Sequence, residues 1–383
     1  MAALVVKTIV TLALPVSPSS DFANWVHLAQ VASDQIRNGT IPSVETFGAY
    51  TFMGIILVPF FLVWSALSKV PPVFAVALLG QSSLETYFLV FMMKLPIILG
   101  DFLSGIMISL IATRFRSGVP TKGFWIWFLN PYTTYLMEYG GTFDILPTLV
   151  FLGALYLGLQ RKWFGSGFLL AVASLLRFFP VFAFPFFTLQ ALKQKSKRGI
   201  IMFLFSYGLP ILAVISVQVA MNGSLGGFMG VISYVIANQP WLLVFLGFSL
   251  SSFVNLTPFL LIIQIYLVVR YWKSQASLVD SALVGVLVLL VASYHQPYDV
   301  TWIIPLITIY YLVNSDWTIL YTLLIITSYL YYVGFNTPDL TISYVQPLFA
   351  GLFYGVKGVY LIRANVKAFG WKKETVRKYA FGL

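Results

Sequence analysis

The chain has 383 residues, of which 59% are hydrophobic and only 9% are charged, and its net charge is +11. Soluble domains carry about 25% charged residues, so this composition excludes an ordinary soluble protein and predicts an integral membrane protein. Because the chain has no cysteine and only two histidines, disulfides, thiolate metal sites and histidine-rich metal sites are also excluded. The basic residues are dispersed among short loops, and we therefore expect no nucleic-acid partner.

Apolar runs recur along the sequence, and a run of about 20 residues is long enough to cross a bilayer. They predict an all-α fold, a polytopic transmembrane helical bundle of about 11 to 14 spans. We place the spans at approximately residues 3–17, 49–68, 73–93, 96–113, 123–137, 143–159, 164–177, 179–192, 199–220, 256–272, 278–294, 300–313, 317–333 and 346–362. Residues 1–362 then form one transmembrane domain with outer segments at 17–48 and 221–255, and residues 363–383 form a basic tail. The first run lacks a basic cluster at its start, so we interpret it as an uncleaved helix rather than a signal peptide.

The distribution of charged residues predicts which side of the cell membrane each loop faces. Lys and Arg are retained on the cytoplasmic side, so we expect the N-terminus and the tail inside, where the tail suits anionic membrane lipid. The inner loops then carry Lys69, Arg114, Arg116, Lys122, Arg161, Lys162, Lys193 to Arg198, Arg270 and Lys273. Most acids fall outside, at Asp21, Asp34, Glu45, Glu138, Asp144, Asp299 and Asp339. This bias is expected for a solvated outer face, and equally for an acidic, water-filled pocket that opens outward.

The first outer segment carries a helical pattern from Asp21 to Arg37, in which Phe22, Trp25 and Val26 recur at helical spacing. Such an amphipathic helix could lie in the membrane interface. Asp21 opens the helix directly after the first span, where its carboxylate could accept a proton from an attacking hydroxyl. The structural alternative is a charge that stabilises the N-terminus of the helix.

Two further segments place charged groups near the outer side. Lys94 precedes Pro96, which we expect to begin a span, and Asp101 lies within that span, where a charge costs about 2.5–3.5 kcal/mol. Asp101 is therefore a functional candidate, or it pairs with a Lys or Tyr of a neighbouring helix. Asp144 ends the polar turn that contains Glu138, and it either only caps the next helix or contributes to a site.

The run from Gly165 to Arg198 has basic residues on both flanks and Arg177 in its middle. One straight helix would place Arg177 near the bilayer centre, so we predict two short helices that meet at Phe179-Pro180. Arg177 would then lie at the outer rim, where a cation suits an anionic lipid headgroup. In a later outer turn, His295 and Gln296 offer donors to a phosphate or a sugar hydroxyl.

Five ordered stretches resemble the GT-C superfamily of membrane glycosyltransferases, especially its polyprenyl-phosphate-sugar-dependent archaeal and bacterial members and the GPI mannosyltransferases. They are Ser-Asp21-Phe-Ala-Asn-Trp, Lys94-x-Pro-x4-Asp101, Asn-Pro131 through Gly-x-Phe-Asp144, Leu-Leu-Arg177-Phe-Phe-Pro180 and His295-Gln-Pro-Tyr-x3-Trp302-x2-Pro305. The resemblance covers most of residues 1–310 and implies an inverting hexosyltransferase. Its donor would be a polyprenyl- or dolichyl-phosphate-linked mannose or glucose, and its acceptor a lipid-linked glycan or a glycoprotein on the outer side.

The resemblance also implies roles for individual residues. The general base would be Asp21, and the residues at the donor phosphate would be Arg177, His295, Gln296 and Lys94. The residues lining the site would be Asp34, Asp101, Glu138, Asp144 and Tyr298. The sequence departs from the family in one respect, because many members carry paired acids near the first loop, whereas Asp21 is followed by Phe-Ala. Either Asp34 or Glu45 replaces the second acid or none is needed, and dependence on a divalent metal stays open with it.

Two other classes of protein are alternatives. A secondary transporter or flippase of an anionic or lipid-linked substrate needs ionisable residues near the bilayer midplane, often in paired repeats. Here almost all acids are expected at one rim and no internal repeat is found, which favours the enzyme. A non-catalytic assembly subunit with the same fold is the weaker alternative.

Overall fold

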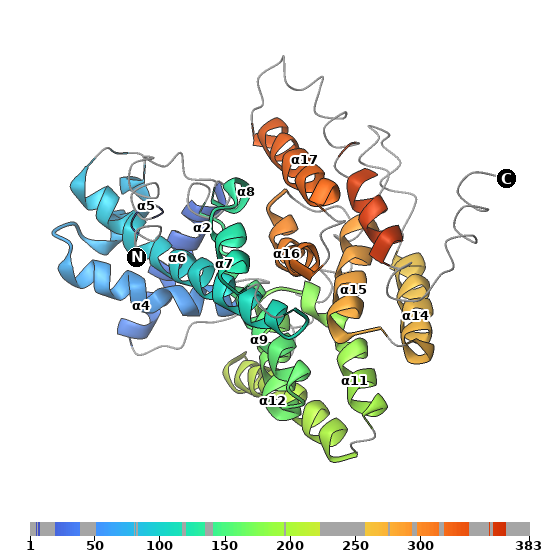
Figure 1. Ribbon diagram of the computed structural model, residues 1–383. Coiled ribbons are helices and arrows are strands. Elements are labelled where there is room, and N and C mark those ends of the chain that lie inside the picture. The colour runs from blue at the N-terminus through green and yellow to red at the C-terminus, as the bar shows by residue number, and fades with distance from the viewer. Residues whose placement is uncertain are drawn as a thin grey trace.

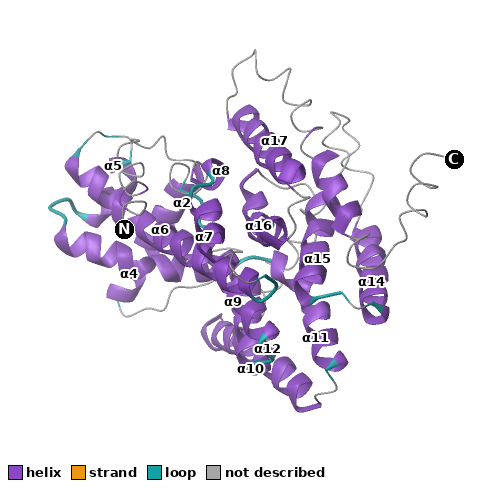
Figure 2. Cartoon of the chain, in the orientation of Figure 1, coloured by secondary structure: helices purple, strands orange, loops and turns teal. Residues whose placement is uncertain are grey.

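The computed structural model describes residues 5, 7, 20–38, 51–79, 81, 83–116, 120–134, 141–194, 197–222, 257–274, 276–292, 297–313, 318–336, 352 and 355–364. Every regular element in this part of the chain is helical, which confirms the predicted all-α class (Figures 1 and 2). The helices are α2 (Ser20–Arg37), α4 (Thr51–Leu67), η2 (Pro72–Phe74), α5 (Ala75–Leu78), α6 (Leu84–Thr113), α7 (Pro120–Phe128), α8 (Pro131–Thr133), α9 (Ile145–Leu159), α10 (Trp163–Leu176), η4 (Phe179–Ala183), α11 (Phe184–Lys193), α12 (Lys197–Asn222), α14 (Thr257–Lys273), α15 (Leu278–Ala292), η7 (Pro297–Trp302), α16 (Ile304–Val313) and α17 (Thr318–Asn336).

Two helices in the described part are long and apolar enough to cross a membrane, α6 and the segment Lys197–Val217 of α12. The number is three if the pair Ile56–Leu67 and Pro72–Leu78, which bends by 117°, counts as one broken span. Shorter apolar helices of 10–17 residues include α9, α10, α15 and α16. These helices are consistent with a membrane protein. The larger number, about 11 to 14 spans, stays a prediction.

Helix α6 differs from the prediction, because it is one helix of 30 residues where the sequence predicts separate spans at 73–93 and 96–113. It begins after Ser83, whose hydroxyl oxygen accepts a hydrogen bond from the backbone N–H of Thr86 at 3.1 Å. Pro96, which was expected to begin a span, lies inside the helix. A single proline removes one backbone hydrogen bond, and a buried helix tolerates that loss when its neighbours pack around it.

The continuous α6 also changes the expected position of Lys69, which the sequence places on the same side as Arg114. The backbone N–H of Lys69 lies 3.4 Å from a carboxylate oxygen of Glu85, in the first turn of α6. Arg114 follows the last residue of the same helix. A helix of this length spans about 45 Å, so the two cations lie at opposite ends of it.

The predicted break in the run from Gly165 to Arg198 is confirmed. Helix α10 ends at Leu176, and Arg177 is extended with φ −152° and ψ 147°. Pro180 lies in the first turn of η4, where the missing N–H of a proline leaves no helical bond unmade. Helix α11 follows directly, so Arg177 lies where two short apolar helices meet.

Helices α10 and α12 pack closely and run in the same direction. A Cβ atom at Gly167 would lie 2.4 Å from the carbonyl oxygen of Phe203 and 2.3 Å from Oγ of Ser206, so the contact requires glycine. At the start of α10, Trp163 meets the same Phe203 edge-on with ring centroids 6.1 Å apart. The N-terminal halves of α10 and α12 therefore lie side by side.

Basic helix ends gather at one side of the bundle, which we call the basic end. Nζ of Lys193, at the end of α11, donates to the carbonyl oxygen of Ser274, just after α14, at 2.8 Å. The Arg114 guanidinium, after α6, lies 5.7 Å from the Tyr156 ring of α9. The cations at this end are Arg114, Arg116, Arg161, Lys162, Lys193, Lys197, Arg198, Arg270 and Lys273. The carboxylate of Asp280 is hydrogen-bonded at the start of α15 beside them.

The predicted helix of the first outer segment is confirmed as α2. Its apolar face is not left for the membrane interface, since Phe22, Val26 and Ala29 are fully buried in the protein. Helices α2, α4, α5 and the first half of α6 form one side of the molecule in Figure 1. The apolar face of α2 therefore packs on the protein, and the position of this helix in the membrane interface stays a prediction.

Candidate functional site

Three side chains from distant parts of the sequence meet at the end of the bundle opposite the basic end, and we call Asp144, Arg177 and Trp302 the Asp144 cluster. Nε of Arg177 lies 2.6 Å from Oδ1 of Asp144, and Nη2 donates to Oδ2 at 3.2 Å. The indole N–H of Trp302 donates to Oδ1 of Asp144 at 3.1 Å. The side chains of Asp144 and Arg177 are 1% and 10% exposed, so both charges are buried.

Each member of the cluster is held at a helix end. Asp144 occupies the N-cap position of α9, but its backbone is already helical, with φ −61° and ψ −15°, and its side chain makes no capping hydrogen bond. The carboxylate faces Arg177 instead, so capping alone does not explain Asp144. Arg177 is the C-cap residue of α10, and Trp302 is the last residue of η7. The Trp302 ring stacks on Phe179, with centroids 4.8 Å apart and an interplanar angle of 13°.

The charges of Asp144 and Arg177 offset each other. Burial of one charge alone would carry a large desolvation cost, and the ion pair with its hydrogen bonds compensates for that cost. A guanidinium presents a planar fork of N–H donors that matches carboxylate and phosphate groups. Arg177 is therefore a cation held in a fixed position. It could bind a phosphate in place of the Asp144 carboxylate or beside it.

The turn before Asp144 connects the cluster to α2. Phe143 stacks on Phe22 with ring centroids 6.3 Å apart and an interplanar angle of 2°. Gly141 has φ +69°, and a Cβ atom there would lie 2.7 Å from the Phe22 ring, so both the backbone and the space require glycine. The backbone of Asp21, one residue before Phe22, lies in the same first turn of α2.

Lys94 approaches the same aromatic contact from α6. Its side chain is fully buried, and its ammonium group lies 5.5 Å from the centroid of the Phe22 ring. A cation above an aromatic face is attracted by the ring electrons. Phe22 thus contacts Lys94 as well as Phe143, the residue before Asp144. The start of α2, the middle of α6 and the start of α9 are thereby brought together.

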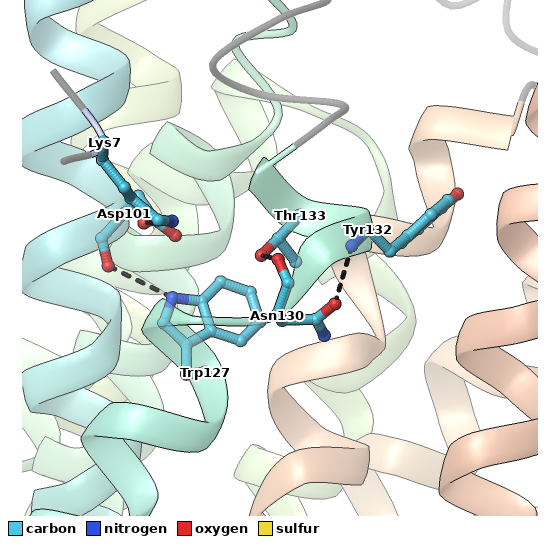
Figure 3. A network of polar contacts seen from close by, with 6 residues as sticks. All are labelled: Lys7, Asp101, Trp127, Asn130, Tyr132 and Thr133. Atoms are coloured by element: carbon cyan, nitrogen blue, oxygen red, sulfur yellow. Dashed lines mark hydrogen bonds and ion pairs between the residues drawn. The ribbon is translucent and has the colours of Figure 1, made fainter. Parts of the chain in front are cut away.

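Asp101 belongs to a separate buried network (Figure 3). Its carboxylate forms an ion pair with the ammonium group of Lys7, which also lies 4.4 Å from the centroid of the Phe128 ring. The indole N–H of Trp127 donates to the backbone carbonyl oxygen of Asp101 at 3.1 Å. This is the pairing with a lysine that the sequence left as the alternative to a functional role. Sequence reasoning missed Lys7, because one lysine in an apolar run gives no sign of its partner.

The other predicted site residues are not placed in the cluster. Asp34 is partly buried on α2, and its position twelve residues after Phe22 separates it from that ring by about 18 Å along the helix axis. Asp21 and Tyr298 lie in α2 and η7, but their side chains are outside the described residues, as are Glu138, His295 and Gln296 altogether. No group of three or more His, Asp or Glu that could hold a metal ion occurs among the residues that the structure describes.

Comparison with known proteins adds no family assignment. No protein-family model matches the sequence, and the comparison with curated proteins also gives no match. The resemblance to the GT-C superfamily therefore rests on the ordered motifs alone.

Proposed function

We propose that this protein is a polytopic membrane glycosyltransferase of the GT-C type. It transfers a hexose, mannose or glucose, from a polyprenyl- or dolichyl-phosphate donor to a lipid-linked glycan or a protein on the outer side of the membrane. The observation that carries the proposal is the buried Arg177 guanidinium, held by Asp144 and Trp302 at a helix break. A guanidinium in such a position suits the phosphate of a lipid-linked donor.

The position of the cluster relative to the basic end supports an outward-facing site. Helix ends rich in Lys and Arg are retained on the cytoplasmic side of a membrane. The α9–α10 connection, with Arg161 and Lys162, lies at the basic end, whereas Asp144 begins α9 and Arg177 follows α10 at their other ends. Both helices would therefore carry the cluster to the side opposite the cytoplasm, where a polyprenyl-phosphate donor is used in the resembled family.

In the proposed reaction, an acceptor hydroxyl attacks the anomeric carbon of the donor sugar from the face opposite the phosphate. The carbon–oxygen bond to the phosphate breaks, the configuration inverts, and the carboxylate of Asp21 takes the hydroxyl proton. Arg177 stabilises the negative charge that grows on the departing lipid phosphate. Asp144 and Trp302 hold the guanidinium in place, and Lys94 adds positive charge behind Phe22.

A transfer assay with purified protein in lipid tests this function. The protein is given radiolabelled polyprenyl-phosphate-mannose or -glucose and a membrane glycolipid extract, and Asp21→Asn is compared with Asp34→Asn on the same helix. Loss of a positioned general base lowers rates by about 10²–10⁴-fold, so we expect transfer by the wild type and by Asp34→Asn but not by Asp21→Asn. Equal transfer by wild type and Asp21→Asn would refute the role of Asp21.

A transporter or flippase of a lipid-linked substrate is the second candidate. The observation that favours it is the ion pair between Lys7 and Asp101, buried along the apolar helix α6. In this case the same assay shows no glycosyl transfer, while the labelled donor moves across the bilayer of sealed vesicles. That movement should then be lost in Asp101→Asn and kept in Asp21→Asn, the reverse of the pattern expected for the enzyme.

A further inference from the structure

A cavity of about 340 Å³ lies between α7, the turn after it, α16 and α17, and none of the residues that line it belongs to the Asp144 cluster. Its volume is at the lower end of the range of small-molecule sites, about 300–1,000 Å³. The lining residues combine aromatic and aliphatic side chains with Asn130 and Thr322, and none of them is charged. A ligand that fits this cavity is therefore small, largely apolar and uncharged.

Two stacked tyrosine rings and several exposed apolar side chains line the open cavity. Tyr311 and Tyr321 stack with ring centroids 5.0 Å apart and an interplanar angle of 10°. Trp125, Leu129 and Ile326 also line the cavity, and they are 40%, 61% and 50% exposed. In a membrane protein, apolar side chains with such exposure face the hydrocarbon of the bilayer. A hydrocarbon chain could therefore enter from the bilayer and lie on the tyrosine wall.

Hydrogen bonds orient Asn130 and Tyr321 in the cavity. Oδ1 of Asn130 accepts the backbone N–H of Tyr132 at 3.0 Å, which orients the amide (Figure 3), and Nδ2 donates to the hydroxyl oxygen of Tyr321 at 3.3 Å. Oγ1 of Thr308 lies 3.4 Å from the same oxygen. Asn130 and Thr308 both donate toward this phenolic oxygen, so the O–H of Tyr321 itself is the donor that a ligand oxygen would meet.

We propose that this cavity binds one uncharged amphiphile, whose hydrocarbon chain lies along Tyr311 and Tyr321 and whose hydroxyl or ester oxygen hydrogen-bonds to the Tyr321 hydroxyl. An uncharged headgroup fits this lining better than a phosphate does, because the lining offers no cation to compensate a charge that loses hydration there. The occupant therefore differs in chemistry from the polyprenyl-phosphate donor proposed for Arg177. The site does not depend on the proposed glycosyl transfer.

Photolabelling of the full-length protein in nanodiscs tests the site with a monoacylglycerol that carries a diazirine in its acyl chain. We expect saturable adducts on the peptides that contain Trp125 to Pro131 and Tyr321 to Ile326. An excess of unlabelled monoacylglycerol should displace the probe, whereas polyprenyl phosphate at the same concentration should not. Adducts spread evenly over the exposed faces of α12 and α14 would show general lipid contact and refute the proposal. Displacement by polyprenyl phosphate alone would refute the uncharged headgroup.

Two variants, each with a matched control, distinguish a loss of labelling at this site from a loss caused by altered folding. Tyr321→Phe keeps the stacked ring and removes the hydrogen bond to the ligand, together with the contacts of the hydroxyl with Asn130 and Thr308. We therefore expect labelling at subsaturating probe to be about 2- to 10-fold weaker. Tyr266→Phe, on the exposed face of α14, should not change it. Thr322→Trp fills the mouth of the cavity and should abolish saturable labelling, while Phe205→Trp on α12 should leave it intact. Wild-type labelling in both Tyr321→Phe and Thr322→Trp would overturn the proposal.

Discussion

At the residue scale, Asp144 compensates the charge of the Arg177 guanidinium and fixes its orientation. The carboxylate offsets a cation that is only 10% exposed, and the indole of Trp302 orients the carboxylate. The pair links positions that lie 33 residues apart and joins the start of α9 to the end of α10. Asp144 therefore serves the proposed donor site as a positioning residue, and it also contributes to stability.

A double-mutant cycle tests whether these two charges depend on each other. Asp144→Ala leaves the guanidinium buried without its carboxylate, and such a loss costs about 3–5 kcal/mol of unfolding free energy. Asp144→Ala combined with Arg177→Met removes both charges, so we expect a smaller loss than the sum of the single variants, with a coupling of about 0.5–3 kcal/mol.

The measurement is urea unfolding in a mild detergent, followed by tryptophan fluorescence. Lys197→Met at the exposed basic end is the control for loss of a surface cation, and it should change the unfolding free energy by no more than about 0.5 kcal/mol. Strict additivity of the two single variants would show that Asp144 and Arg177 do not stabilise each other.

At the element scale, the sequence predicts where a helix breaks better than it predicts that a helix continues. The break at Arg177 could be predicted because a central cation, a proline and two basic flanks all favour it. The continuity of helix α6 could not be predicted, because Pro96 usually indicates a helix break and its effect depends on the packing around it. The start of α6 did have a local signal in Ser83, which caps the helix through the N–H of Thr86.

The contact between α10 and α12 gives a prediction at this scale with a control on the same pair of helices. A Cβ atom at Gly167 would overlap the backbone of Phe203, whereas a Cβ atom at Gly208 would meet nothing within 4 Å. Gly167→Ala should therefore lower the unfolding free energy by about 1–3 kcal/mol, the usual cost of overpacking. Gly208→Ala should raise it by about 0.5–1 kcal/mol, because alanine favours a helix over glycine.

Thermal unfolding in detergent, read by circular dichroism, compares the two alanine variants directly. Equal midpoints for Gly167→Ala and Gly208→Ala would contradict the close approach of α10 and α12. A lower midpoint for Gly208→Ala alone would indicate that the face of α12 described as open is in fact covered.

At the scale of the whole molecule, the basic end and the Asp144 cluster lie at opposite ends of the same helices. Composition predicts the helical class, because this property is local to the sequence, and the sidedness that the charges predict stays a prediction. Composition and charge do not predict which carboxylate meets which cation. Lys7 and Asp101 lie 94 positions apart, and only the packing of the chain brings them together.

Sidedness can be measured with single cysteines, because the natural sequence contains none. Lys197→Cys lies at the basic end, and Asn38→Cys follows α2, whose last residue, Arg37, contacts Ser65 of α4 near the start of α6. In intact cells, a membrane-impermeant maleimide should label Asn38→Cys but not Lys197→Cys, and permeabilised cells should show both. The reverse pattern would place the basic end outside and contradict the proposed orientation.

The central claim is that Arg177 binds the phosphate of a lipid-linked donor, and the most direct test is the affinity of polyprenyl phosphate for the protein in nanodiscs. A hydrogen bond to a charged group contributes about 1.5–3 kcal/mol, so Arg177→Gln should weaken binding by about 10- to 150-fold. Asp144→Asn keeps a side-chain oxygen that can position the guanidinium and removes the competing carboxylate charge, so it should bind at least as tightly as the wild type. Equal affinity for wild type and Arg177→Gln would contradict the account.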